Sequence, residues 1–296
     1  MNKVLITDPI DQSGIDILSQ VAQVDQKIGI SESDLATIIQ DYDALMIRSG
    51  TQVTGQIINS SKNLRIIGRA GVGVDNVDVK AATQKGVLVV NSPGGNTIAA
   101  AEHTIAMMLA LSRNIPIANS SMFEGKWERK KFVGNELFKK KLGVVGLGKI
   151  GTHVAKVANA MGMEVLGYDP FVSNERAQQL QVKLSELDIL FQDSDYVTLH
   201  LPRTVETENL VDNKVLKSMK NTAKLINCAR GGIIDEEALA EALNNSLIGG
   251  AAIDVYSEEP LNANSPLLKV EKNLILTPHL GASTKEAQEN VAIDVA

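Results

Sequence analysis

The sequence predicts an α/β fold built from two doubly wound domains, and three observations lead to this prediction. Short β-branched runs alternate with helical patterns along almost the whole chain, as in parallel sheets covered by helices on both faces. At 296 residues, the chain exceeds the size at which one hydrophobic core usually keeps growing. A Gly-x-Gly-x-x-Gly turn at residues 146–151 follows an apolar strand, which is typical of a Rossmann-type domain.

The first domain is predicted from alternating elements that precede residue 91. Apolar β-branched runs indicate the strands, which we expect at Lys3–Thr7, Ala44–Arg48, Leu64–Gly68 and Val87–Val90. Between them, helical patterns are expected at Gly14–Gln20, Ser33–Gln40, Gly55–Ser60 and Val77–Gln84.

A cluster of turn formers at residues 91–96 predicts a hinge and the start of a long helix at Thr97–Ser112. A basic loop, Lys126–Lys131, then leads to a second set of alternating elements. Its strands are expected at Lys141–Gly146, Glu164–Tyr168, Tyr196–Leu201, Ala223–Asn227, Gly249–Asp254 and Leu274–Leu276. A capping box that opens with Ser283 predicts a last helix, which has no C-cap signal, so we expect the natural protein to be longer.

The composition restricts the possible environments and partners of the protein. With 44% hydrophobic and 22% charged residues, no apolar run approaches a bilayer span, and the first residues lack a signal-peptide pattern. The only cysteine, Cys228, allows no internal disulfide, so we expect a cytoplasmic protein. A net charge of -6 argues against a nucleic-acid partner but leaves room for a local basic pocket that binds a small anion.

The glycine turn predicts a dinucleotide site. Gly146 makes the tight turn, Gly148 allows the pyrophosphate to approach the backbone, and Gly151 lets the helix pack on the strand. Asp169 lies 18 positions after Gly151, a spacing that suits an acid binding the ribose hydroxyls and favours NAD over NADP. The alternative for Asp169 is a solvated turn residue before Pro170.

Arg230, Glu259 and His279 each follow a predicted strand, where open α/β sheets bind their ligands. The Arg230 guanidinium suits a substrate carboxylate, and His279 is the candidate acid/base for oxidation of a hydroxy acid, with Glu259 orienting the imidazole. Taken singly, Arg230 could pair with a surface acid and Glu259 could lie in a solvated loop.

The other three histidines and the cysteine are expected to be structural. His103 falls in a largely apolar helix, His153 follows the glycine turn, and His200 lies in an apolar strand. Cys228 has no activating base nearby in the sequence and is expected to line the cofactor site as a small packing residue.

The chain resembles the D-isomer-specific 2-hydroxyacid dehydrogenase family over its whole length. The most specific matches are the strings at residues 69–76, 126–132, 227–232 and 278–286. The resemblance implies NAD-dependent oxidation of 3-phospho-D-glycerate to 3-phosphohydroxypyruvate, the first step of L-serine biosynthesis. It also implies a discontinuous, flavodoxin-like substrate-binding domain at residues 1–96 and 281–296, with an NAD-binding domain at 97–280 inserted in it.

The resemblance extends the set of expected site residues, and no metal is among the expected ligands. Cofactor positions are Gly146, Gly148, Lys149, Ile150, Gly151, Asp169, Leu201, Cys228, Ala229, Arg230, Asp254, His279, Leu280, Gly281 and Ala282, with Val72 from the first domain. Some family members have threonine where this chain has Val72 and Leu201, whose side chains offer no hydrogen bond.

Substrate contacts are expected at Arg48, Ser49, Arg69, Gly71, Val72, Gly73, Arg230 and His279. Arg48 and Arg69 suit a phosphate or carboxylate facing the cleft between the domains, although each taken alone could be a surface arginine. The loop Lys126–Lys131 resembles a segment that reaches the partner subunit, so a homodimer is expected, with the helix after Asn96 in its interface.

Two alternative functions follow from the same residues. A glyoxylate or hydroxypyruvate reductase would share every catalytic residue and would differ at the phosphate site. A corepressor-like, NAD-sensing interaction protein would bind the dinucleotide without turnover.

Overall fold

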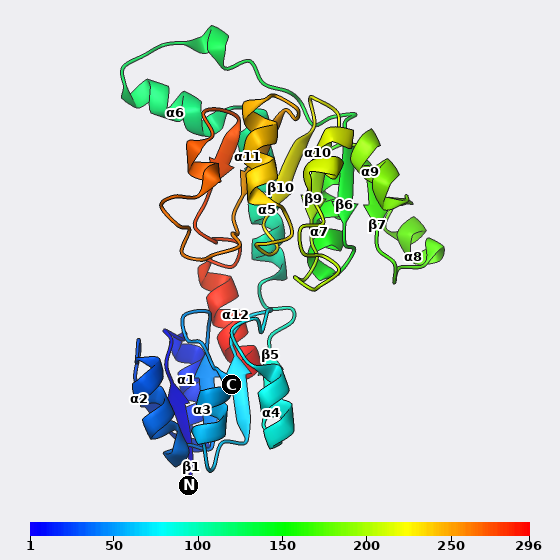
Figure 1. The fold of residues 1–296 in the computed structure, drawn as a ribbon. Helices are drawn as coiled ribbons and strands as arrows, with labels where there is room; N and C mark the ends of the chain where they lie inside the picture. The colour runs from blue at the N-terminus through cyan, green and yellow to red at the C-terminus, as the bar shows by residue number, and fades with distance from the viewer. The chain divides into compact units, whose positions relative to one another are not determined.

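The computed structural model describes residues 1–296, which divide into two compact units. Unit 1 comprises Met1–Ala99 and Ala282–Ala296, and unit 2 comprises Ala100–Gly281 (Figure 1). The structure divides the chain after residues 99 and 281, whereas the expected divisions were after residues 96 and 280. Both units contain a parallel sheet with interleaved helices, so the predicted α/β class is confirmed. None of the helices combines the length and the apolar character needed to cross a membrane.

The sheet of unit 1 has five parallel strands in the order β2-β1-β3-β4-β5, the flavodoxin-like arrangement. The strands are β1 Asn2–Ile6, β2 Ala22–Gln26, β3 Ala44–Ile47, β4 Ile66–Arg69 and β5 Leu88–Asn91. The strand β2 was not predicted, because it is an edge strand whose sequence, Ala-Gln-Val-Asp-Gln, is mostly polar and only partly buried.

The helices of unit 1 are α1 Gln12–Ser19, α2 Glu32–Ile38, α3 Gly55–Ser60, α4 Val79–Lys85 and α12 Lys285–Val295, with a 3-10 turn at Ile39–Asp41. The starts of α1, α2, α4 and α12 differ from the predicted ones by one or two residues. Helix α4 begins later than expected because the Asp78 side chain accepts the Ala81 N–H as its N-cap. In α12 the N-cap is Thr284, whose hydroxyl accepts the Ala287 N–H, and not Ser283.

The sheet of unit 2 has seven parallel strands in the order β12-β11-β10-β9-β6-β7-β8. Counted from β6, this is the Rossmann order 3-2-1-4-5-6 with one further strand, β12, at the edge. The strands are β6 Lys141–Val145, β7 Glu164–Tyr168, β8 Lys183–Leu184, β9 Tyr196–Leu199, β10 Lys224–Asn227, β11 Gly250–Ile253 and β12 Leu274–Leu276. The two-residue strand β8 was not predicted.

Helices cover both faces of this sheet. Val145 and Leu225 belong to one buried cluster, while Val144 and Ile226 belong to a second one, as alternation along a strand requires. The helices are α5 Thr97–Ser112, α6 Ile115–Phe123, α7 Lys149–Ala160, α8 Asn174–Gln179, α9 Leu187–Asp193, α10 Asn213–Ser218 and α11 Glu236–Asn244, with 3-10 turns at Arg129–Lys131 and Pro266–Lys269. Helix α6 was not predicted, although the proline in its first turn is a signal for a helix start.

Candidate active site

The glycine turn joins β6 to α7, and close contacts require a glycine at two of its three glycine positions. Gly146 has φ +93°, and a Cβ there would lie 2.5 Å from the His200 carbonyl oxygen. A Cβ on Gly151 would lie 1.9 Å from the Gly146 carbonyl oxygen, so the helix packs directly on the turn. A Cβ on Gly148 would meet open space. The backbone at the start of α7 is therefore accessible, and this arrangement fits a dinucleotide pyrophosphate.

Asp169 is tied to the glycine turn. Its carboxylate accepts the Leu147 N–H at 2.8 Å through Oδ2 and the Phe171 N–H at 2.9 Å through Oδ1. Both hydrogen bonds fix the Asp169 carboxylate beside the accessible backbone at Gly148. A solvated turn residue would have no such contact with the turn at Leu147.

Three neighbouring parallel strands carry the other candidate residues at their carboxyl ends. Register pairs Asn227 of β10 with Ile253 of β11, and Ile253 with Leu276 of β12. Arg230 comes three residues after the first of these, and His279 three residues after the last. The loop that carries Glu259 follows β11, so all three residues follow strand ends at the same edge of the sheet.

The structure brings Glu259 and His279 into direct contact, with Glu259 Oε2 2.6 Å from His279 Nδ1. The second carboxylate oxygen, Oε1, accepts the Tyr256 N–H at 3.0 Å. Partial burial by itself raises the pKa of Glu259, but the hydrogen bonds from His279 and Tyr256 outweigh it and lower the pKa below its usual 4.5. The carboxylate is therefore ionised at neutral pH and can orient the imidazole.

The His279 turn is built around the carboxylate of Asp254, whose side chain is completely buried. Asp254 Oδ1 accepts the Leu280 N–H at 2.8 Å, and Oδ2 accepts the Gly281 N–H at 2.9 Å. The Asp254 carbonyl oxygen accepts the His279 N–H at 2.9 Å. Backbone and side chain of one aspartate thus fix three consecutive residues of the turn, including the candidate acid/base.

Two further side chains contact Asp254. Thr277 donates its hydroxyl to Oδ1 at 2.5 Å, and His103 Nε2 of α5 lies 3.2 Å from the same oxygen. Burial raises the pKa of Asp254, but the hydrogen bonds from His103, Thr277 and the Leu280 N–H outweigh it and lower the pKa below 3.8. These contacts could not be expected from the sequence. His103 is 151 positions from Asp254, and no local signal connects the two.

The Arg230 turn lies against the loop that carries Glu259. A Cβ on Gly231 would lie 1.7 Å from the Tyr256 carbonyl oxygen, so only glycine permits this approach. Buried Asn227 holds the turn from inside, donating to the Arg230 carbonyl oxygen at 2.9 Å and accepting the Ala229 N–H at 3.0 Å. The Arg230 side chain donates from Nη1 to the Ala229 carbonyl oxygen at 2.7 Å.

Cys228 directly follows β10. Burial, with a smaller effect of Asp254, raises the pKa of the Cys228 thiol to about 12, so the thiol is protonated and not a nucleophile. Burial lowers the pKa of His200 to about 4, so this ring is neutral at pH 7, and it contacts the Thr198 hydroxyl at 3.0 Å. His200 directly follows β9 and so lies just outside the strand in which it was expected.

Three of the remaining expected cofactor positions, Lys149, Ile150 and Leu201, lie beside the glycine turn. Lys149 and Ile150 are the first residues of α7. Leu201 lies beyond the end of β9, outside the strand in which it was expected, and its side chain is 3.0 Å from the position of a Cβ on Gly146. Ala282 is the first residue of the second segment of unit 1.

In unit 1, the loop with Arg48 and Ser49 follows β3 and is held by two side chains. The carboxylate of Asp8, which follows β1, accepts the N–H groups of Arg48 at 2.6 Å and Thr51 at 3.1 Å. Asn76 Nδ2 donates to the carbonyl oxygens of the same two residues, at 2.7 and 2.6 Å. The loop conformation is thus fixed independently of the Arg48 side chain.

Arg69 is the last residue of β4, paired with Ile47, and does not follow the strand as expected. Its guanidinium folds over Gly71, where a Cβ would lie 1.7 Å from Nη1. The expected substrate loop, residues 71–73, is anchored to the end of β5. There the Ser92 N–H donates to the Gly71 carbonyl oxygen at 3.0 Å, and Asn91 donates to the Val72 carbonyl oxygen.

Comparisons with known proteins show which family the chain matches. The family model for the D-isomer specific 2-hydroxyacid dehydrogenase NAD binding domain matches residues 105–281. A D-3-phosphoglycerate dehydrogenase of Synechocystis sp. is 62% identical over 296 residues, covering 100% of this chain and 53% of the relative. The chain spans about half the length of the curated relatives it matches.

Two solved structures have the same fold. The TT0316 protein of Thermus thermophilus matches with a TM-score of 0.90 and 32% identity, covering 98% of this chain and 93% of that one. A D-lactate dehydrogenase of Aquifex aeolicus, complexed with NAD and lactic acid, matches with a TM-score of 0.88 and 26% identity, covering 99% and 92%.

Proposed function

Because the chain belongs to the D-isomer specific 2-hydroxyacid dehydrogenase family, we propose that it oxidises 3-phospho-D-glycerate to 3-phosphohydroxypyruvate with NAD, the first step of L-serine biosynthesis. The observation that carries the chemistry is the 2.6 Å contact between His279 Nδ1 and Glu259 Oε2. The identity of the substrate is supported by the name of the Synechocystis relative, which the chain matches along all of its own length.

In this proposal, His279 is the general base. Its Nδ1–H donates to the Glu259 carboxylate, which leaves Nε2 to accept the proton of the substrate hydroxyl group. The ionised Glu259 then stabilises the imidazolium that forms. Arg230 binds the substrate carboxylate with two parallel hydrogen bonds, so that the hydroxyl-bearing carbon is held in place. In the reverse direction, the imidazolium returns the proton to the keto oxygen.

NAD supplies the hydride acceptor when it is bound. Gly148 and the first turn of α7 would hold the pyrophosphate, and Asp169 would accept hydrogen bonds from the ribose hydroxyls. Cys228 and Asp254 would line the nicotinamide end. A carboxylate at position 169 repels a 2′-phosphate, which supports NAD in preference to NADP.

We assign the substrate phosphate to Arg48 and Arg69 of unit 1, with Ser49 and the loop at residues 71–73 as further contacts. Both arginines lie at the ends of the paired strands β3 and β4. A phosphate dianion bound by two guanidinium groups would distinguish 3-phosphoglycerate from D-glycerate.

Steady-state assays with 3-phosphoglycerate and D-glycerate, each with NAD and NADP, test the proposed function. We expect the highest kcat/KM for 3-phosphoglycerate with NAD, and Arg48→Ala and Arg69→Ala should reduce this preference. Equal efficiency on both acids would favour a glyoxylate or hydroxypyruvate reductase. NADH binding without turnover of any hydroxy or keto acid would favour the interaction protein.

We also propose that the protein acts in the cytoplasm as a homodimer. The segment after α5 exposes large apolar side chains, including Phe123 at 84%, Trp127 at 80% and Val133 at 81%, which a partner subunit would cover. Light scattering on the purified chain should give about twice its 31.7 kDa mass. The monomer mass at micromolar concentration would refute the dimer.

A further inference from the structure

We propose that Glu236 is a positioning residue for the Glu259–His279 pair, and that it acts through Ser257. The inference rests on the proposed function for its kinetic consequence, whereas its structural consequence can be measured without substrate. Glu236 was not among the residues that the sequence singled out.

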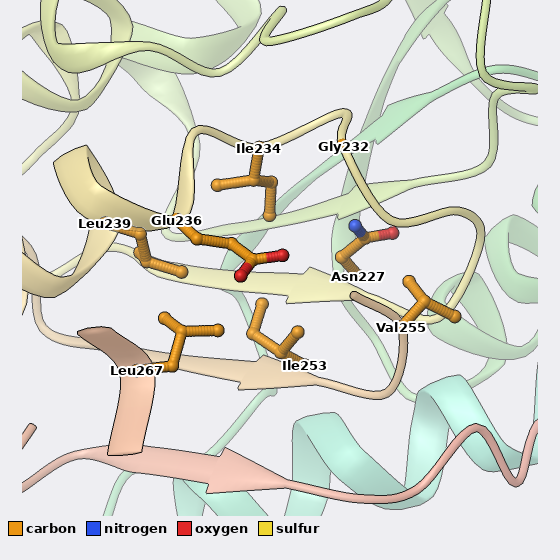
Figure 2. Close-up of a pocket in the computed structure, with 8 residues that line it drawn as sticks. All are labelled: Asn227, Gly232, Ile234, Glu236, Leu239, Ile253, Val255 and Leu267. Carbon is orange, nitrogen blue, oxygen red and sulfur yellow. The ribbon is translucent and has the colours of Figure 1, made fainter. Parts of the chain in front are cut away.

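Glu236 is the first residue of α11, whose N-cap is Asp235. Its carboxylate points away from the helix into a small pocket between the exit turns of β10 and β11 (Figure 2). The pocket is lined by Asn227, Gly232, Ile234, Glu236, Leu239, Ile253, Val255 and Leu267. Its free volume is about 10 Å³, room for roughly one water molecule.

The Glu236 carboxylate makes two hydrogen bonds to one residue of the Glu259 loop. Ser257 donates both its backbone N–H and its hydroxyl to Glu236 Oε1, each at 2.7 Å. Hydrogen bonds to an ionised acceptor are the stronger class, and two bonds to one oxygen restrict the position of Ser257. Helix α11 therefore holds the loop at residue 257.

In the chain, Ser257 lies between Tyr256, whose N–H holds the proposed catalytic carboxylate, and Glu259, which carries that carboxylate. The preceding residue, Tyr256, donates its N–H to Glu259 Oε1 at 3.0 Å, and its hydroxyl donates to the Thr277 carbonyl oxygen at 2.8 Å. Glu259 in turn holds His279 Nδ1. A loop that moves at Ser257 would shift the Tyr256 N–H, and with it the carboxylate that orients the imidazole.

The simpler explanation for Glu236 is an acid in the first turn of a helix, where negative charge is generally favourable. Glu237 satisfies that explanation equally well, because it lies in the same turn, carries the same charge and is exposed. The two residues differ in the contact with Ser257, so Glu237→Ala is a matched control for Glu236→Ala.

The structural test uses the imidazole signals of ¹⁵N-histidine-labelled protein, which contains four histidines. The His279 signal is assigned by its loss in His279→Gln. We expect a low-field Nδ1–H resonance in the parent, in Glu237→Ala and in Glu236→Gln, whose amide oxygen still accepts from Ser257. In Glu236→Ala this resonance should be broadened or lost. An unchanged resonance in folded Glu236→Ala would overturn the inference.

The kinetic test compares the same variants in 3-phosphoglycerate oxidation. Glu236→Ala should lower kcat about tenfold, since a displacement of about 1 Å in a catalytic group can cost more than this. Its Kd for NADH should stay within about twofold of the parent value, as expected when binding and chemistry are affected separately. Glu236→Gln should recover most of the lost rate. Ser257→Ala should lower kcat in the parent by a smaller factor, because its backbone N–H still donates to Glu236. It should have no further effect in Glu236→Ala, where the hydroxyl bond is already lost.

Three results would count against the inference: parent-like kcat in Glu236→Ala, an equal loss in Glu237→Ala, or additive effects of Glu236→Ala and Ser257→Ala. If the parent turns over no hydroxy acid, the proposed function fails, while the imidazole resonance still decides whether Glu236 positions the pair.

Discussion

Both units place candidate ligand-binding residues in turns at the carboxyl ends of parallel strands, but the turns are held in different ways. In unit 1, Asp8 holds the Arg48 loop by two backbone N–H groups, and Asn91 and Ser92 hold the adjacent loop. In unit 2, Asp254 likewise holds the His279 turn by two backbone N–H groups, and the turns also contact one another directly. Gly231 abuts Tyr256, whose hydroxyl reaches the carbonyl oxygen of the residue before Pro278.

This difference corresponds to the tasks that we propose for the two units. Binding a phosphate requires cations and a suitably shaped backbone, and small shifts of either are tolerable. Transfer of a proton from a hydroxyl group to His279 requires the imidazole to lie within hydrogen-bond distance and in one tautomer. Unit 2 meets the second demand through contacts between turns that are far apart in the sequence. The following predictions test whether those contacts have this effect.

Replacing the candidate base should have the largest effect. His279→Ala should lower kcat by roughly 10²–10⁴, the usual worth of positioned proton transfer, while NADH affinity stays nearly constant. Stopped-flow or steady-state absorbance of NADH measures the rate, and fluorescence titration measures the affinity. His153→Ala, on α7, is the histidine control and should keep kcat. Unchanged turnover in His279→Ala would remove the residue from the mechanism.

Gly231→Ala should separate the Arg230 turn from the Glu259 loop. The new Cβ would stand 1.7 Å from the Tyr256 carbonyl oxygen, so one turn must move. We expect kcat to fall by about tenfold or more, as for other misplaced catalytic groups. Gly86→Ala, at φ +75° in the C-cap of α4, controls for general destabilisation. It should cost roughly 1 kcal/mol of stability and keep kcat. Equal kinetics in both variants would show that the contact between the turns is unimportant.

Asp169→Asn should change cofactor preference more than it changes chemistry. The amide oxygen can still accept a backbone N–H, but the charge that repels a 2′-phosphate is gone. The ratio of kcat/KM with NAD to kcat/KM with NADP should fall by about tenfold, equivalent to roughly 1.4 kcal/mol. The measurement is a pair of cofactor titrations at saturating 3-phosphoglycerate. A ratio equal to that of the parent would mean that Asp169 only holds the glycine turn.

Asp254→Asn should have a smaller, pH-dependent effect on stability. The folded-state pKa of Asp254 is lowered below 3.8, so its contribution is present above that pH and is lost as the pH falls through the folded value. At pH 7 the variant should lose about 2 kcal/mol, the usual worth of hydrogen bonds to a charged group. Thermal midpoints should therefore differ by a few degrees at pH 7, and the difference should shrink below pH 4. Glu289→Gln, exposed on α12, should show no such trend. A constant difference across this range would contradict the assigned ionisation.

The sequence predicted the parts of the site that depend on short spacings. The glycine turn and the position of Asp169 both follow from one strand-turn-helix unit of about 30 residues. The positions of Arg230, Glu259 and His279 after strands were also visible, because each follows an apolar run. Their shared edge follows from the parallel register.

Contacts between distant turns could not be predicted in this way. His103 lies in an apolar helix and contacts Asp254 only because α5 packs beside that turn, and Glu236 looks like any acid at the start of a helix. The fold shows the same limit. The mostly polar edge strand β2 and the cap of α12 at Thr284 depend on which backbone groups are paired in the folded chain. A shift of one residue in a helix cap, as from Ser283 to Thr284, hardly changes the hydrophobic pattern of the sequence.

A crystal structure of the complex with NADH and 3-phosphoglycerate, a combination that cannot react, tests the central claim most directly. The account predicts the substrate carboxylate on the Arg230 guanidinium and the C2 hydroxyl roughly 2.6–3.2 Å from His279 Nε2, with Glu259 still on Nδ1. A complex in which that hydroxyl contacts another side chain, with the His279 imidazole directed elsewhere, would contradict it.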